Sequence, residues 1–124
     1  MASAPVYNKS HTDFPTYVRD NDAENTGIED VITGSSGSIY TIYIDNSDNG
    51  SQENFLKLYN TKDPTVGTTV PDVIIRAYRA TTLIVTSKQG VAFSTACSAA
   101  VVTDDGTSGT TAPGSAVHLA IIGS

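Results

Sequence analysis

The chain has little of the chemistry on which most enzymes and metalloproteins depend. Among its 124 residues are one cysteine, two histidines and no tryptophan, and only 16% of the residues are charged. The single cysteine, Cys97, cannot form a disulfide within the chain. No cluster of histidine, cysteine or carboxylate residues has the spacing of metal ligands, and no Gly-x-Ser-x-Gly motif is present. We therefore expect a protein that is not an enzyme and that uses no metal or cofactor.

Basic residues and long apolar runs are also scarce. Seven Lys and Arg stand against thirteen Asp and Glu, which leaves a net charge of −6. Nucleic-acid binding needs clustered basic residues, so we expect no nucleic-acid partner. No run approaches the roughly 20 apolar residues of a membrane helix, and residues 1–26 lack the apolar segment of a secretion signal. We expect no membrane partner, and a protein that stays in the cytoplasm or is assembled there into a particle released by lysis.

What the sequence does contain is the alternation typical of β-strands. In Asn54–Asn60, Leu56 and Leu58 alternate with larger or charged residues, which predicts that these two leucines face the core. Similar patterns predict further strands at Gly27–Thr33, Ser38–Asp45, Asp72–Arg79, Thr81–Ser87, Gly90–Ser98 and Ser115–Ile122. The sequence therefore predicts an all-β fold of about seven to nine strands, a two-sheet β-sandwich with jelly-roll-like or Greek-key connections.

One polar turn has two interpretations. Asn49-Gly50 is a strong signal for a two-residue β-hairpin turn. A calcium loop is the alternative, because Asp45, Ser47 and Asn49 have the spacing of the first three EF-hand ligands. However, Leu56 occupies the position where that loop needs a glutamate, and no helical pattern flanks it. We interpret the segment as a hairpin turn.

The first 26 residues differ from the rest because they have no sustained periodicity. One interpretation is a free polar tail. The other is an extended N-terminal arm, favoured by Pro5 and Pro15, whose apolar residues dock on a neighbouring molecule. The expected partner-binding residues are Tyr7, Phe14, Tyr17 and Val18. We predict an arm at residues 1–26 and a sandwich at residues 27–124 that folds without the arm.

Three short motifs in the C-terminal half resemble a known class of proteins. They are Leu-Lys-Leu-Tyr at Leu56–Tyr59, Pro-Thr-Val-Gly-Thr-x-x-Pro at Pro64–Pro71, and Gly-Val-Ala-Phe-Ser-Thr at Gly90–Thr95. This pattern resembles small β-sandwich virion proteins of tailed bacteriophages that decorate or cement capsids. Between Ile75 and Gly90 the chain departs from the pattern.

The resemblance implies a function for the whole chain. It implies a capsid decoration protein that binds the outer capsid surface and stabilises contacts between capsomers. The expected partners are the major capsid protein and further copies of the chain, in a homotrimer, and the expected location is the virion. Self-association is also favoured by Ser38–Asp45, which is partly apolar on both faces.

Two other functions remain open. One is a virion structural protein of the tail, baseplate or fibre, built on the same sandwich. The other is a carbohydrate-binding module, which ranks lower because such modules usually present tryptophan or several aligned tyrosines, and this chain has no tryptophan.

Overall fold

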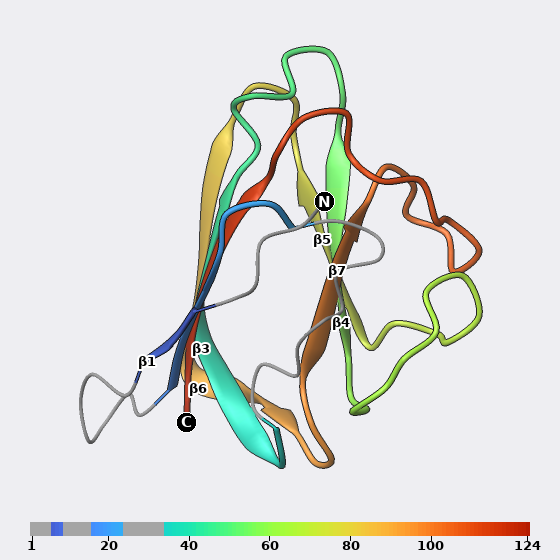
Figure 1. Cartoon of the computed structure of the whole chain (residues 1–124). Coiled ribbons are helices and arrows are strands. Elements are labelled where there is room, and N and C mark those ends of the chain that lie inside the picture. Colours follow the sequence, from blue (N-terminus) through green and yellow to red (C-terminus); the bar gives the residue numbers. More distant parts are fainter. Residues whose placement is uncertain (1–5, 9–15, 24–33) are drawn as a thin grey trace.

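The structure is a computed structural model that describes residues 6–8, 16–23 and 34–124, and these form eight strands and no helix. The strands are β1 (Val6–Asn8), β2 (Thr16–Asp20), β3 (Gly37–Asp45), β4 (Asn54–Tyr59), β5 (Val73–Ala77), β6 (Thr82–Phe93), β7 (Ser98–Val102) and β8 (His118–Gly123). They build a five-stranded sheet in the order β1-β2-β8-β3-β6 and a three-stranded sheet in the order β5-β4-β7. The two sheets face each other as layers (Figure 1), so the predicted two-sheet β-sandwich is confirmed.

The connections give the sandwich a jelly-roll order. The chain passes from the larger sheet to the smaller one between β3 and β4, and it changes sheet again after β5, β6 and β7. Every described strand pair is antiparallel, as in double-sheet jelly rolls. The last strand, β8, lies between β2 and β3. The C-terminal strand is therefore central to the larger sheet, and its pairing depends on segments far away in the sequence.

The core lies between the sheets and follows the alternation in the sequence. Leu56 and Leu58 of β4 are 0% and 1% exposed, as predicted. The larger sheet covers them with Ile44 of β3 and with Leu119 and Ile121 of β8. Successive strand residues point to opposite faces, so every second residue of each strand enters this layer.

Part of the outer face of the smaller sheet, on β4 and β7, is buried as well. Lys57 and Tyr59 point away from the core, yet each is 0% exposed. The loops that follow β4 and β7 lie on this side of the smaller sheet (Figure 1), and the Lys57 ammonium donates a hydrogen bond to the carbonyl oxygen of Gly106 in the loop after β7. Burial lowers the pKa of Lys57, and the nearby Asp104 and Asp105 oppose that shift. The β4 part of this face is thus covered within the chain, whereas Ile74 of β5, which is aligned with Lys57, stays 44% exposed.

Part of the predicted arm is a strand of the sandwich. β2 pairs with β8 from Thr16↔Gly123 to Asp20↔Leu119. Val18 of β2 lies in the core at 2% exposure, and the Ala23 amide donates to the Val117 carbonyl oxygen at 2.9 Å. These residues stabilise the sandwich by burial, which corrects the expectation that they belong to a separate arm. The predicted boundary after residue 26 and the predicted strand at 27–33 lie outside the described residues.

A second correction concerns Gly90, which does not begin a new strand. β6 runs through it without interruption, and the irregularity in the pairing of β3 with β6 falls between Ile39 and Thr41. Gly90 has a φ of 81°, and a Cβ there would lie 2.9 Å from the Tyr40 ring. Glycine therefore allows a bulge within one long strand. The predicted strand Gly90–Ser98 is wrong beyond Phe93, where the chain turns before β7.

Candidate functional site

The loop between β3 and β4 is held together by buried asparagines. Asn46 is 0% exposed, and its Oδ1 accepts hydrogen bonds from the side-chain amides of Asn49 at 2.9 Å and Asn54 at 2.7 Å. Its Nδ2 lies within 3.0–3.2 Å of the carbonyl oxygens of Gln52, Ala77 and Tyr78. Because β3 and β4 belong to different sheets, the predicted two-residue hairpin is wrong. The segment joins the two layers, and Asn46 is its centre.

The same loop does not assemble the calcium ligands of the alternative interpretation. The Asp45 carboxylate accepts hydrogen bonds from the Ser47 amide at 2.9 Å and the Thr82 hydroxyl at 3.2 Å. Asn49, in contrast, is buried and bonds to Asn46 and to the backbone of Ser115. These two expected ligands therefore serve different contacts. Among residues 6–8, 16–23 and 34–124, no group of three or more His, Cys, Asp and Glu could hold a metal ion.

Cys97 is a buried thiol in the turn before β7. It is 0% exposed, and burial raises its pKa to about 12. Only the thiolate is strongly nucleophilic, so Cys97 is protonated and inaccessible at neutral pH. The thiol therefore acts as a small core residue.

We expect Cys97 to react with a thiol reagent such as iodoacetamide only when the chain opens. At pH 8 the folded chain should be alkylated at least about 100-fold more slowly than the urea-unfolded chain. The measurement is the mass increase with time, with and without urea. Because the folded pKa lies above the ordinary value of 9.0, ionisation of the unfolded thiol should also lower stability as the pH rises above 9. Rapid alkylation of the folded chain would contradict this placement of Cys97.

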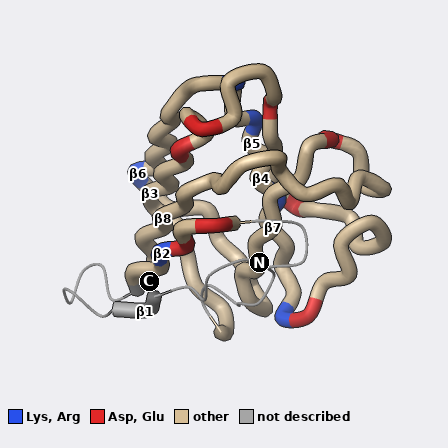
Figure 2. The backbone as a smooth tube through the Cα atoms, turned by 45° about the horizontal axis from the view of Figure 1, so that its top comes forward, with Lys and Arg blue, Asp and Glu red and all other residues tan. Residues whose placement is uncertain are grey.

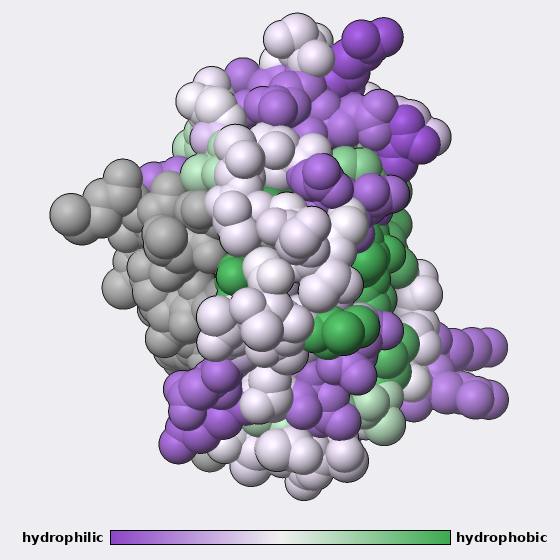
Figure 3. All heavy atoms as spheres, turned by 90° about the vertical axis from the view of Figure 1, so that its right-hand side faces the viewer, coloured by the Kyte–Doolittle hydropathy of each residue, from purple (hydrophilic) through white to green (hydrophobic). Residues whose placement is uncertain are grey.

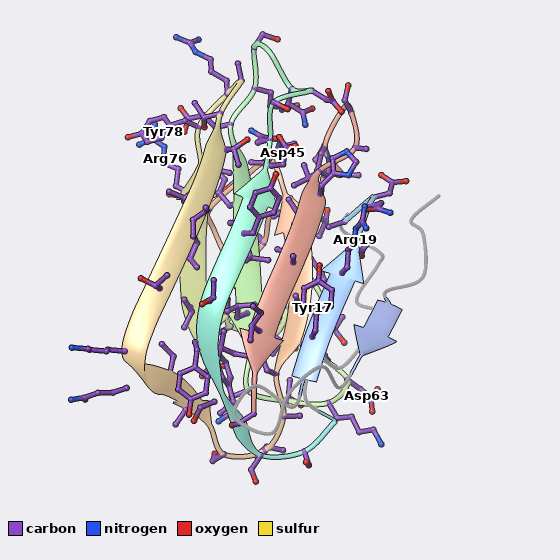
Figure 4. The ribbon with its side chains drawn as sticks, turned by 90° about the vertical axis from the view of Figure 1, so that its left-hand side faces the viewer. Tyr17, Arg19, Asp45, Asp63, Arg76 and Tyr78 are labelled. Atoms are coloured by element: carbon purple, nitrogen blue, oxygen red, sulfur yellow. The ribbon has the colours of Figure 1, made fainter. Side chains whose placement is uncertain are left out.

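The outer face of the five-stranded sheet carries a pocket of about 410 Å³. We call it the tyrosine pocket, and its lining residues are Tyr17, Arg19, Asn21, Tyr43, Asp45, His118, Leu119 and Ala120. Arg19 and Tyr43 are both aligned with Ala120 of β8, which lies between their strands. Because Ala120 is small, it leaves a hollow between the larger side chains of β2 and β3. Figure 4 shows Tyr17 and Arg19 on β2 and Asp45 at the end of β3, on the same face of the sheet.

The upper end of the tyrosine pocket is polar and of mixed charge. Hydrogen bonds from the side chain and the backbone amide of Ser47 lower the pKa of Asp45, so this carboxylate is ionised at neutral pH. Nε of Arg19 donates to Oδ1 of Asn21 at 3.0 Å. Nε2 of His118 lies 3.7 Å from Oδ2 of Asp48. The pocket therefore offers strong hydrogen-bond acceptors and donors side by side.

A second surface feature is an apolar groove between the edges of the two sheets, which we call the apolar seam. It encloses about 160 Å³ between edge strands β5 and β6. Its lining is mainly apolar and consists of Ile39, Tyr40, Ile42, Leu58, Val73, Ile75, Val85, Ser87 and Val91. Apolar residues also gather in a patch beside the polar loops on the side that carries the smaller sheet (Figure 3).

The strands beside the apolar seam expose further apolar side chains. Ile74 of β5 is 44% exposed, and Ile84 and Val91 of β6 are 63% and 42% exposed. Edge strands usually carry charges that prevent pairing with another chain. β6 has only one charged residue, Lys88, and is uncharged from Thr82 to Ser87. The apolar seam and the edge of β6 therefore form a surface suited to contact with another protein.

Charged residues lie near the end of β5, on the face opposite the Val73 and Ile75 side chains that line the seam. The Arg76 guanidinium forms an ion pair with the Glu53 carboxylate, and its centre lies 4.3 Å from the centroid of the Tyr78 ring. The ion pair raises the pKa of Arg76 and lowers that of Glu53. These side chains are exposed, so the pair stabilises the fold only weakly.

The structure separates the four expected partner-binding residues. Tyr17 lines the tyrosine pocket, and Val18 is buried in the core, so Val18 cannot reach a partner while β2 stays paired. Tyr7 belongs to β1, which pairs with β2, and Phe14 lies outside the described residues. Arg19, Tyr43, Asp45 and His118 line one pocket that the sequence alone does not predict. Alternation places each of them on one face of its own strand, but only strand pairing brings the strands together.

Neither a known family model, nor a curated protein, nor a solved structure matches this chain. The part of the chain that the structure describes has no helix long and apolar enough to cross a membrane. The fold and the two surface features define a β-sandwich protein with two candidate binding surfaces.

Proposed function

We propose that the protein is a capsid decoration protein of a tailed bacteriophage, which binds the outer capsid surface and stabilises contacts between capsomers. Three sequence motifs at Leu56–Tyr59, Pro64–Pro71 and Gly90–Thr95 support this proposal by their resemblance to such proteins. The jelly-roll sandwich is compatible with it, because viral structural proteins use this architecture.

The observation that carries a structural role is the apolar seam beside the edge of β6. Its apolar lining, which includes the exposed Val91, would be covered by contact with a neighbouring molecule. A long edge strand with a single charged residue next to such a groove is unfavourable in a free monomer. In a protein that is always assembled with copies of itself and with a capsid, the apolar seam and the edge of β6 would both be covered.

The number of copies per particle tests the proposed function. Purified virions that contain the protein should be analysed by quantitative mass spectrometry against the major capsid protein. Hundreds of copies per particle support a capsid decoration protein. A few to dozens of copies per particle would instead support a tail, baseplate or fibre protein. Absence from the particle would overturn both assignments.

We expect the apolar seam to be the contact between copies of the chain. Val91→Glu places a charge at its rim, and burial of an unpaired charge is costly. In light scattering at tens of micromolar, the wild-type chain should be an oligomer, which we propose is a trimer. The Val91→Glu chain should be a monomer under the same conditions. Val70→Glu is the matched control, because Val70 is also an exposed valine, 69% exposed, but lies in the loop before β5 and does not line the seam.

Two results would argue against this contact. A wild-type chain that stays monomeric would refute self-association. A Val91→Glu chain that keeps the wild-type mass while folded would place the contact on another surface.

A further inference from the structure

We propose that the tyrosine pocket binds a neutral sugar unit of a glycan chain. This inference goes beyond the proposed virion role, which places no demand on the outer face of the five-stranded sheet. It rests on the shape of the pocket, on the chemistry of its lining and on the charges around it.

The shape is that of a shallow site for a small molecule. Its volume of about 410 Å³ lies within the range of small-molecule sites, roughly 300–1,000 Å³. β2 and β3 lie on either side of β8, so their side chains are separated by two strand spacings, about 10 Å. Tyr17 comes from the first of these strands and Tyr43 from the other, and Ala120 lies between Tyr43 and Arg19, which is two residues along β2 from Tyr17. The pocket therefore has an aromatic side chain on each flank and a small residue in its floor.

The lining matches a ligand that is apolar on its ring face and polar at its rim. The Tyr43 side chain is 36% exposed although it projects from the middle of the sheet. Aromatic rings of this kind can pack against the C–H face of a sugar ring. At the upper end, the Asp45 carboxylate can accept hydrogen bonds from sugar hydroxyls, and the Arg19 guanidinium and Asn21 amide can donate them. Hydrogen bonds to charged groups are the stronger ones.

The charges around the pocket favour a neutral ligand over an anionic one. Arg19 is the only Lys or Arg in the lining, and basic residues lie spread over separate elements of the molecule (Figure 2). Asp45 balances that charge inside the pocket, and Asp48 lies 3.7 Å from His118 at its edge. A phosphate or sulfate group would meet two carboxylates and one guanidinium, and like charges repel.

The position of the pocket favours a glycan over an extended peptide. A peptide strand binds a sheet through unpaired backbone groups at an edge. In the pocket, the backbone of β8 is paired on both sides, with β2 and with β3. Recognition there must use side chains alone, and the side chains present are two tyrosines and a few convergent polar groups.

The test is a titration of the full-length ¹⁵N-labelled chain with soluble neutral oligosaccharides, followed by NMR. The probes are cellohexaose, laminarihexaose, maltohexaose and mannohexaose at millimolar concentration, with inorganic phosphate and a heparin hexasaccharide as anionic comparators. We expect at least one neutral probe to shift the amide signals of Ala120 and Tyr43, and the anionic comparators to leave them unchanged.

Variants then assign the binding to the tyrosine pocket. Tyr43→Ala and Asp45→Asn should each weaken binding of that probe about tenfold or more, about 1.4 kcal/mol. Tyr78→Ala is the matched control, because Tyr78 is also an exposed tyrosine, 56% exposed, but it follows β5 of the smaller sheet and does not line the pocket. Its affinity should equal that of the wild type. The amide spectrum of each variant reports whether it is folded.

The inference is overturned if no neutral oligosaccharide shifts these signals. It is also overturned if binding survives in the folded Tyr17→Ala/Tyr43→Ala double variant, or if the anionic comparators bind here and the neutral probes do not. The map of shifted signals in the wild-type chain decides the question even if a variant fails to fold. None of these results depends on the copy number in virions, so the virion role and the sugar site can fail separately.

Discussion

A chain that lacks residues 1–26 is expected to lose most of its stability. The deletion removes β2, which pairs with β8 and contributes Val18 to the core, and it removes the contact of Ala23 with Val117. Burial of a valine side chain stabilises a fold by about 1.5–3 kcal/mol, and whole domains are stable by only about 5–15 kcal/mol. The deletion also leaves β8, which lies between β2 and β3 in the full chain, with an exposed edge. The melting temperature should fall by at least about 10 °C, or the cooperative transition should disappear.

The control for this deletion is a chain that lacks only residues 1–15. It loses β1, which pairs with β2 alone among the described strands, and it retains β2. Its thermal unfolding, followed by circular dichroism, should stay within a few degrees of the full chain. If the chain without residues 1–26 also melts within a few degrees of wild type, β2 is not part of the cooperative unit and the N-terminal segment is independent.

Replacement of Asn46 by alanine is expected to be the most damaging polar substitution in the loop between β3 and β4. Asn46 accepts hydrogen bonds from Asn49 and Asn54 and donates to backbone carbonyls near β5, all in or close to the interior. Each buried group left without a partner costs about 1–3 kcal/mol. We expect the free energy of unfolding to fall by roughly 3 kcal/mol or more, measured by urea denaturation.

Ser47→Ala is the matched control for Asn46→Ala, because Ser47 is its exposed neighbour in the same loop. Ser47→Ala should change the free energy of unfolding by less than about 1 kcal/mol, since substitutions at exposed positions are usually mild. If Asn46→Ala is no more harmful than Ser47→Ala, water or a shifted loop replaces the network, and Asn46 is not its centre.

The capsid role and the sugar site rest on different observations. The capsid role rests on motifs in the sequence, with support from the apolar seam at the edges of β5 and β6. The sugar site rests on side chains that only strand pairing brings together. A virion protein could have both, with the apolar seam turned toward neighbouring subunits and the outer sheet face turned toward solvent.

Local sequence was enough to determine the fold class and much of the core. The alternation at Leu56 and Leu58 identified a strand and the face it buries, and the alternation at Leu119 and Ile121 did the same for the last strand. Alternation within a strand depends only on neighbouring residues, because successive side chains point to opposite faces whatever the partner.

The tertiary structure alone decided which strands are neighbours, and with it the candidate site. Val18 sits in a short segment without clear periodicity, and it is a core residue because β2 pairs with β8, about a hundred residues later in the chain. Asn46 is a turn residue by composition but a buried centre because two sheets meet there. The tyrosine pocket exists because β8 places Ala120 between Tyr43 and the side chains of β2. Strand partners are set by the packing of the whole chain, and a local pattern carries no information about a partner so distant in sequence.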